Sequence, residues 1–271
     1  MLTEDLFSAG WENTCALDSA DNIHCWGANF HGEGNSIPGT FEKVSAGYGH
    51  NCAIDSSSSV QCWGWNVEGQ RNAPTSGSFM DVSTGWFHSC ALETNGSVQC
   101  WGGDIPTSPS GTFTSISSGD YHSCGLSSAG NIACWNTTTS PAGGEYGEAS
   151  PPASTFTQFE VGESHGCGVT TSGSVECWGL DNQGQASPPA GSFLQVVVGT
   201  MHSCGLLETG EVQCWGQDSY DIVNDLSGEF GVYLSSRNNH TCLFNFLDEL
   251  QCWGRDVNGQ ATIPASYGGL F

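Results

Sequence analysis

The chain has 271 residues, of which 28 are acidic and only 4 are basic, so its formal net charge at pH 7 is −24. Such a charge repels phosphate backbones and anionic lipid surfaces, which excludes nucleic acids and acidic membranes as partners. No apolar run approaches the roughly 18 residues of a membrane span. The N-terminal MLTEDLF also lacks the features of a signal peptide, so we expect neither membrane insertion nor a leader.

One short phrase recurs seven times along the chain: a cysteine, nine residues, a second cysteine and a tryptophan. The first cysteines follow one another at intervals of 34 to 43 residues, which is typical of repeat proteins with one supersecondary unit per repeat. The cysteine pairs, in chain order, are Cys15/Cys25, Cys52/Cys62, Cys90/Cys100, Cys124/Cys134, Cys167/Cys177, Cys204/Cys214 and Cys242/Cys252. They use every cysteine in the chain.

Each repeat is expected to hold short strands, and the third shows them most clearly. Apolar residues alternate along 78–85 and 86–92, and again along 97–102, with the turn residues Asn95 and Gly96 between the last two segments. This pattern indicates strands joined in a hairpin. No segment has the 3.6-residue period of an amphipathic helix, and 38 glycines and 10 prolines fit a loop-rich all-β chain.

The two cysteines of each repeat flank the hairpin turn symmetrically. They should therefore face each other across adjacent antiparallel strands, within reach of a disulfide. Closing such an eleven-residue ring would stabilise the fold by roughly 2–3 kcal/mol, and one bridge per repeat implies an oxidising compartment. Zinc ligation, reduced pairs in a cytosolic protein and pairing between repeats are the alternatives. The short spacing usual for zinc cysteines is absent.

A longer consensus surrounds the cysteines: Gly-x-x-His-x-Cys-x-Leu, a turn, Val-x-Cys-Trp-Gly, and often Asn-x-x-Gly-Gln, as at 66–70. The glycine becomes Arg237 in the seventh repeat, the histidine becomes Asn13 in the first, and Asn136 follows Trp135 in the fourth. This consensus resembles the regulator of chromosome condensation repeat family, whose members are seven-bladed β-propellers. The cysteine pairs resemble those of its extracellular variants, including crinkly-type plant receptor ectodomains.

The resemblance implies one propeller domain over residues 1–271, with one disulfide in each blade. The C-terminal segment 264–271 matches 189–193, which leads into the first strand of a repeat, and the chain begins within that same strand at 2–10. We therefore expect the N-terminal strand to complete the last blade and close the ring.

Six histidines occupy one position of the repeat: His50, His88, His122, His165, His202 and His240. They could line a central shaft and bind metal. The alternative, which we prefer, is that each ring bonds to backbone within or between blades, because no carboxylate partner recurs beside them. The repeated tryptophans are expected to pack between blades.

The two residues between the glycine and the histidine vary most, so the fold does not dictate them. By resemblance to secreted β-lactamase inhibitor propellers and the plant ultraviolet-B photoreceptor, which use nearby residues for protein contacts, they form a loop on one face. We predict a binding face made of Trp11, Glu12, Tyr48, Trp86, Phe87, Asp120, Tyr121, Glu163 and Met201. Exposed aromatics with an acidic rim suit a protein hot spot or a sugar platform. The alternative is that these residues cap the core between blades.

No catalytic motif is present in the sequence: it has no Gly-x-Ser-x-Gly, no His-Glu-x-x-His and no phosphate-binding glycine loop. We predict neither catalytic residues nor a cofactor. The acidic stretch from Asp218 to Glu229 could bind Ca²⁺, although its spacing fits no EF-hand and a solvated loop is the simpler interpretation. Glycosylation sequons begin at Asn95, Asn136 and Asn239.

The sequence thus predicts a non-catalytic binding module that is extracellular, on the cell surface or periplasmic, and that recognises a protein partner through one loop face. A structural subunit of an extracellular assembly, formed by self-association, and a carbohydrate-binding propeller remain as alternatives. Neither the partner nor the oligomeric state follows from the sequence.

Overall fold

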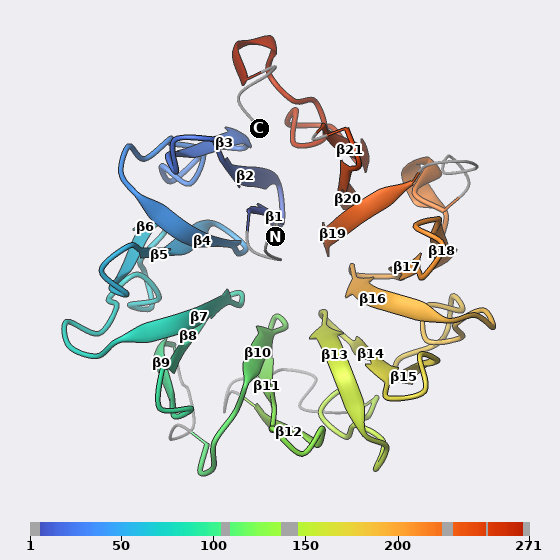
Figure 1. Ribbon diagram of the computed structural model, residues 1–271. Helices are drawn as coiled ribbons and strands as arrows, with labels where there is room; N and C mark the ends of the chain where they lie inside the picture. Colours follow the sequence, from blue (N-terminus) through green and yellow to red (C-terminus); the bar gives the residue numbers. More distant parts are fainter. Residues whose placement is uncertain (1–5, 104–108, 137–145, 224–229, 248, 268–271) are drawn as a thin grey trace.

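The computed structural model describes residues 6–103, 109–136, 146–223, 230–247 and 249–267. It contains seven three-stranded sheets arranged in a ring around a central axis (Figure 1). Each sheet takes its three strands consecutively from one repeat, which confirms the all-β seven-bladed propeller. No helix in these ranges is long and apolar enough to cross a membrane.

Each blade has an inner, a middle and an outer strand, all antiparallel to their neighbours. The inner strands are β1 (Phe7–Ala9), β4 (Phe41–Ala46), β7 (Phe79–Thr84), β10 (Ser115–Ser118), β13 (Phe156–Val161), β16 (Phe193–Val198) and β19 (Gly231–Arg237). The middle strands are β2 (Asn13–Leu17), β5 (His50–Asp55), β8 (His88–Glu93), β11 (His122–Leu126), β14 (His165–Thr170), β17 (His202–Leu207) and β20 (His240–Asn245). The outer strands are β3 (Ile23–Gly27), β6 (Val60–Gly64), β9 (Val98–Gly102), β12 (Ile132–Asn136), β15 (Val175–Gly179), β18 (Val212–Gly216) and β21 (Leu250–Gly254). Two short 3₁₀ helices, η1 (Ser219–Asp221) and η2 (Ala265–Tyr267), follow β18 and β21.

The predicted pairing of cysteines within each repeat is confirmed in all seven blades. The register of the middle and outer strands places the two cysteines directly opposite each other, with Cα atoms 4.0 to 4.1 Å apart, near the roughly 4.5 Å of a non-hydrogen-bonded antiparallel pair. The bridges are Cys15–Cys25, Cys52–Cys62, Cys90–Cys100, Cys124–Cys134, Cys167–Cys177, Cys204–Cys214 and Cys242–Cys252. No cysteine is free.

The two cysteines of a bridge differ in burial, which the symmetric spacing in the sequence did not indicate. Every cysteine of a middle strand is fully buried. In the first blade the outer cysteine, Cys25, is buried as well, whereas the other six outer cysteines are only half-buried: Cys62, Cys100, Cys134, Cys177, Cys214 and Cys252. The reason is that the outer strand is the edge of a three-stranded sheet, with no fourth strand beside it.

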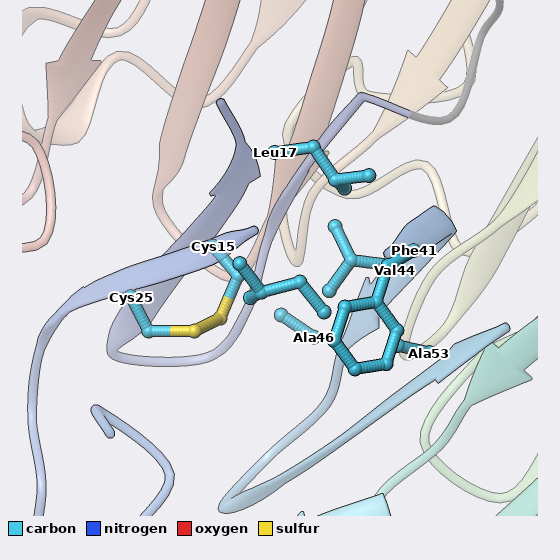
Figure 2. Packing of buried hydrophobic residues seen from close by; sticks show 8 residues of the cluster. Cys15, Leu17, Cys25, Phe41, Val44, Ala46 and Ala53 are labelled. Atoms are coloured by element: carbon cyan, nitrogen blue, oxygen red, sulfur yellow. A yellow bond between two sulfur atoms is a disulfide. The ribbon is translucent and has the colours of Figure 1, made fainter. Parts of the chain in front are cut away.

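The hydrophobic core is divided into layers between neighbouring blades. In the layer between the first and second blades, Cys15 and Leu17 of β2 meet Phe41 and Val44 of β4 (Figure 2). The layer between the fifth and sixth blades repeats this plan with Cys167 of β14 and other residues of β14 and β16. Each blade therefore buries its apolar side chains mainly against its neighbours, as in other repeat proteins.

A hydrogen bond between histidine and hydroxyl side chains joins most neighbouring blades. The hydroxyl belongs to the next blade, to the residue directly after the one that aligns with the histidine. Its oxygen lies 2.8 to 2.9 Å from the histidine Nε2. The pairs are His50–Ser89, His88–Ser123, His165–Ser203, His202–Thr241 and His240–Thr14. In the first blade Asn13 replaces histidine and donates from Nδ2 to Asn51 Oδ1. The histidines thus bond between blades, as expected, but to side-chain hydroxyls rather than to backbone.

The tautomer of His50 follows from the hydrogen bond that its partner hydroxyl donates. Ser89 donates its only hydrogen to the carbonyl of Gln70, at 3.0 Å. It must therefore accept from Nε2–H of His50, which leaves Nδ1 without a hydrogen. That Nδ1 is buried and unpartnered, and burial lowers the pKa of His50 to about 3.

The glycine three residues before the histidine makes room for close approach. A Cβ atom on Gly119 would lie 2.0 Å from the carbonyl oxygen of Gly162 in the next blade, and one on Gly85 would lie 2.3 Å from Cε1 of His88. The recurrent Gly-x-x-His spacing therefore allows the inner turns of adjacent blades, and the imidazoles, to pack against the glycine Cα atoms.

Closure of the ring differs from our expectation in one respect. We expected the N-terminal strand to complete the last blade, but β1 pairs with β2 of its own repeat, from Phe7 opposite Ala16 to Ala9 opposite Thr14. The first and last blades are joined by side chains instead. Thr14 bonds to His240 and to the carbonyl of Gln260, and Ala9 N–H donates to the hydroxyl of Ser235. Residues 1–5 and 268–271, also part of that expectation, lie outside the described ranges.

The stability of the protein is expected to fall with acidification. Burial lowers the pKa of His50, His88, His165 and His202 to about 3 and that of His122 and His240 to about 4. When the pH falls below the ordinary histidine pKa of 6.5, the unfolded chain binds protons before the folded protein does. The contribution of the histidines to the free energy of unfolding is therefore fully present above pH 6.5. It decreases toward pH 4, by up to about 1.4 kcal/mol per pH unit for each ring.

Urea unfolding between pH 7 and pH 4 measures this slope. His202→Asn should make the slope shallower, whereas His31→Asn, at an exposed position outside the ring of histidines, should leave it unchanged. Glu160 and Glu163 act in the opposite direction, because burial raises the pKa of Glu160 to about 8 and of Glu163 to about 7. Asp120, whose pKa is also raised by burial, acts in the same way, but three carboxyls do not outweigh six histidines, so a stability that rises on acidification would contradict the prediction.

Gly119→Ala should destabilise the protein by roughly 2–3 kcal/mol, because its Cβ would overlap the carbonyl of Gly162. Gly49→Ala is a matched control in an equivalent turn, where the nearest atoms would lie at 3.6 Å, an ordinary contact. Thermal unfolding of both variants tests the comparison, and equal losses would show that close approach of the turns is not the reason for the glycine.

Candidate interaction face around the central channel

The turns between inner and middle strands all lie on one face, because the blades repeat around the ring in the same orientation. We call this the loop face. It also carries the turns that follow the outer strands, since an antiparallel outer strand returns toward the start of the middle strand. The hairpin turns between middle and outer strands lie on the opposite face.

Five of the predicted binding residues come together on the loop face. Trp86 stands at the centre, 4.6 Å from Tyr48, 5.2 Å from Tyr121, 5.3 Å from Phe87 and 5.8 Å from Trp11, measured between ring centroids. All five side chains are half-buried. Four consecutive blades thus contribute to one stacked group.

Trp65 and His31 extend this group, and sequence reasoning missed both. The Trp65 ring lies 5.4 Å from Phe87 and 6.0 Å from Tyr48, and it stacks on His31 at 5.5 Å. A signal was present, because Trp65 follows Trp63-Gly64 at the start of a trailing turn, on the same face. We define the aromatic cluster as Trp11, Tyr48, Trp65, Trp86, Phe87 and Tyr121.

The remaining predicted residues have other surroundings. Met201, in the sixth blade, accepts a contact from Gln185 Nε2 at 3.6 Å. Glu12 pairs with Arg255, whose Nη1 lies 2.6 Å from Glu12 Oε1, and with Asn258 at 2.9 Å. Glu12 therefore ties the first blade to the seventh.

Arg237 bridges the mouth of the central channel. It occupies the glycine position of the seventh repeat, and its side chain reaches blades three and four on the other side of the ring. Nη1 donates to the carbonyl of Thr84 at 2.7 Å, and Nη2 lies 3.4 Å from Asp120 Oδ1. Because the glycine is replaced, this blade places a cation where the others have only backbone.

Three carboxyl groups share a cavity with that guanidinium. Asp120, Glu160 and Glu163 line a cavity of about 60 Å³ together with Arg237 and Trp11. Burial raises the pKa of all three, to about 8 for Glu160 and about 7 for Glu163, while Arg237 opposes the effect at Asp120 and Glu160. Asp120 thus lies beneath the loop face rather than on an exposed rim.

Small polar side chains line the channel below its mouth. Ser8, Ser45, Ser83, Ser117 and Ser235 each accept from a backbone N–H of the next blade, and Glu160 accepts likewise from Val198 at 2.8 Å. A second cavity, of about 300 Å³, opens toward the other face, where Lys43 pairs with Asp81 at 2.6 Å.

The predicted disulfide cysteines lie apart from this face and take no part in the candidate site. The outer members Cys62, Cys100, Cys134, Cys177, Cys214 and Cys252 pack against the apolar layers between blades. Their role is therefore structural, and they leave the loop face to other side chains.

No group of three or more His, Cys, Asp or Glu side chains is arranged to hold a metal ion within the described ranges. Of the acidic stretch considered for Ca²⁺, residues 224–229 lie outside those ranges, and so do Thr137 and Thr138 of the second sequon.

Comparison with protein families shows to which family this architecture belongs. The model of the regulator of chromosome condensation (RCC1) repeat matches residues 6–33, 41–70, 81–104, 156–185 and 193–221, which is more than half of the chain. The chain belongs to this family. The fourth and seventh repeats of the chain, which contain Asp120 and Arg237, lie outside the matched segments.

Solved structures of RCC1-like propellers are similar to this chain. The ectodomain of the receptor kinase CR4 from Physcomitrella patens is 26% identical, with a TM-score of 0.79 over 92% of this chain and 73% of that one. The ectodomain of ACR4 from Arabidopsis thaliana is 24% identical, with a TM-score of 0.77 over 96% of this chain and 98% of that one. Prp20p from Saccharomyces cerevisiae is 17% identical, with a TM-score of 0.67 over 83% and 74%. A search of curated proteins returned no match.

Arg237→Met should destabilise this RCC1-repeat propeller by about 3 kcal/mol, because it leaves buried carboxyls without their counter-charge. The loss should be larger at pH 8 than at pH 5, since the raised pKa values of Glu160 and Glu163 keep these groups protonated at pH 5. Urea unfolding at both pH values tests this, with Arg71→Met at an exposed position as the control. A loss that is independent of pH would show that Arg237 acts by packing alone.

Proposed function

We propose that residues 1–271 form one propeller domain that acts as a non-catalytic extracellular binding module and recognises a protein partner through the aromatic cluster. The observation that carries this proposal is the gathering of six rings from four consecutive blades on one face, with Trp86 at the centre. Half-buried, pre-stacked aromatics lose little side-chain entropy on binding, which is why they recur at the centres of protein interfaces.

An extracellular location is supported by the seven disulfides, because such bonds persist in oxidising compartments. It is also supported by the likeness to the ectodomains of two receptor kinases. The same fold serves protein recognition elsewhere: Prp20p binds Gsp1p and histones.

The aromatic cluster is separate from the layers that hold the blades together. The inter-blade core consists of the disulfides, of aliphatic and Phe residues from all three strands of each blade, and of repeated tryptophans such as Trp215, which pack between blades as expected. Trp86 and Tyr48 belong to none of these clusters, so their stacking contributes to the loop face. Replacing either residue should therefore leave the inter-blade core unchanged.

Trp86→Ala should reduce capture of a partner from the native extracellular fluid at least tenfold, because it removes the ring on which four others stack. Phe246→Ala is the matched control: Phe246 is 65% exposed and follows β20 in a hairpin turn on the opposite face. It should leave capture unchanged.

Quantitative affinity capture with mass spectrometry compares the two variants with the unchanged protein, and melting temperatures confirm that both are folded. Equal capture by the Trp86 variant would contradict the proposal. Loss in the Phe246 variant alone would move the binding surface to the opposite face, and a glycan array with specific hits would favour the carbohydrate alternative.

A further inference from the structure

The mouth of the central channel has an excess of negative groups. Asp120, Glu160 and Glu163 line the cavity of about 60 Å³ with Arg237 as their single cation, so the ionised group carries a net charge of −2. Unbalanced charge in a buried setting is costly unless a counter-ion arrives or protons are taken up. The site is therefore short of positive charge.

One of these carboxyls has an acceptor with no partner. Asp120 is only 4% exposed, and its Oδ1 faces Arg237 Nη2, whereas its Oδ2 is buried and has no hydrogen bond. Buried carboxylate oxygens in native proteins are nearly always satisfied. Because Asp120 lines the cavity, Oδ2 is placed to accept from a group that enters it.

One aromatic ring of the cluster, that of Trp11, borders the same cavity. Trp11 is part of its lining and stacks on Trp86, which in turn contacts Tyr121, the neighbour of Asp120 in the chain. The negative potential over aromatic faces attracts cations, most strongly where water is excluded. Rings and carboxyls thus favour the same sign of charge at one place.

We propose that this cavity, the ammonium pocket, receives the ammonium group of a lysine side chain presented by the protein partner, with Asp120 Oδ2 as a principal acceptor. The inference deepens the proposed function and rests on it, since the aromatic cluster would hold the chain around that lysine.

The size of the cavity favours ammonium over guanidinium. A volume of about 60 Å³ admits a compact group with three donors, whereas a planar guanidinium needs a flat slot beside two parallel acceptors. A basic partner segment also suits a chain whose net charge is −24, because opposite charges accelerate and orient encounter.

Proton release should accompany binding. The groups that face the cavity are Asp120, Glu160, Glu163 and Arg237, and Tyr121 lies close enough for Asp120 and Glu163 to help raise its pKa to about 12. A cation favours the ionised carboxylates, so binding at pH 7 should release protons from Glu160 and Glu163. Affinity should accordingly increase from pH 6 to pH 8.

Isothermal titration with N-acetyl-lysine methylamide tests the pocket without the partner. Norleucine and arginine methylamides, acetylated in the same way, are the neutral and guanidinium comparisons, and n-butylamine represents a free amine. We expect saturable binding of the lysine probe, at least tenfold weaker binding of the other two amides, and a heat that varies with the ionisation enthalpy of the buffer.

Asp120→Asn and Glu163→Gln should each weaken binding of the lysine probe at least tenfold. Glu208→Gln, which removes the same charge at an exposed turn on the opposite face, should not. Melting temperatures separate loss of binding from loss of fold, and the Glu163 variant keeps the Asp120–Arg237 pair intact should the Asp120 variant unfold.

Equal binding of the norleucine or arginine probe, or full binding by both pocket variants, would overturn the proposal. Binding of n-butylamine without the lysine amide would also overturn it, because the pocket would then take free amines. So would Ca²⁺ binding that depends on Asp120. If the lysine probe does not bind but partner capture depends on Trp86, the ammonium pocket is refuted and the proposed function stands. If the lysine probe binds but capture does not depend on Trp86, recognition through the aromatic cluster is refuted.

Discussion

The hydrogen bond from a buried imidazole to the hydroxyl of the next blade is the interaction on which this ring depends. Each sheet has only three strands and shares its apolar layers with its neighbours, so no blade has a core of its own. The bond needs a neutral ring and a hydroxyl at one place in the adjacent blade, and in most repeats a glycine three residues before the histidine makes room for it. A serine or threonine follows the histidine position in five of the seven repeats, and the bond between His240 and Thr14 joins the two ends of the chain although Arg237 replaces the glycine there.

Covalent and non-covalent bonds hold different parts of the ring. Disulfides fix the middle strand to the outer strand inside each blade. Hydrogen bonds connect one blade to the next, as between His240 and Thr14, from Ala9 N–H to the Ser235 hydroxyl, and from the Trp26 indole to the carbonyl of Gln260. The regular series is interrupted where Asn13 replaces a histidine, where His122 Nε2 has no partner because Gly166 stands at the hydroxyl position of the next blade, and where Arg237 replaces a glycine. The Arg237 side chain ends beside blades three and four, so one of these three departures places charge at the channel mouth.

The scarcity of basic residues shapes the surface. Of the four in the chain, Lys43, Arg237 and Arg255 are engaged by Asp81, Asp120 and Glu12, and Arg71 donates to the carbonyl of Gly64. The protein therefore has few cations of its own to offer the carboxyls around the aromatic cluster. In the proposed complex the complementary charge comes from the partner, and the aromatic rings supply the apolar area beside it.

The sequence by itself determined the blades. The spacing of Cys15 and Cys25 and of their counterparts specified hairpins, disulfides and seven repeats, because each depends on contacts between residues close in the chain. It also indicated Trp11, Tyr48, Trp86, Phe87 and Tyr121, since residues that vary at a fixed position are free of the fold. Only the tertiary structure decided that these rings touch, that Trp65 joins them, that β1 stays in its own blade and that Arg237 reaches Asp120. Those contacts cross between blades, and local sequence patterns carry no information about which side chains meet across a ring.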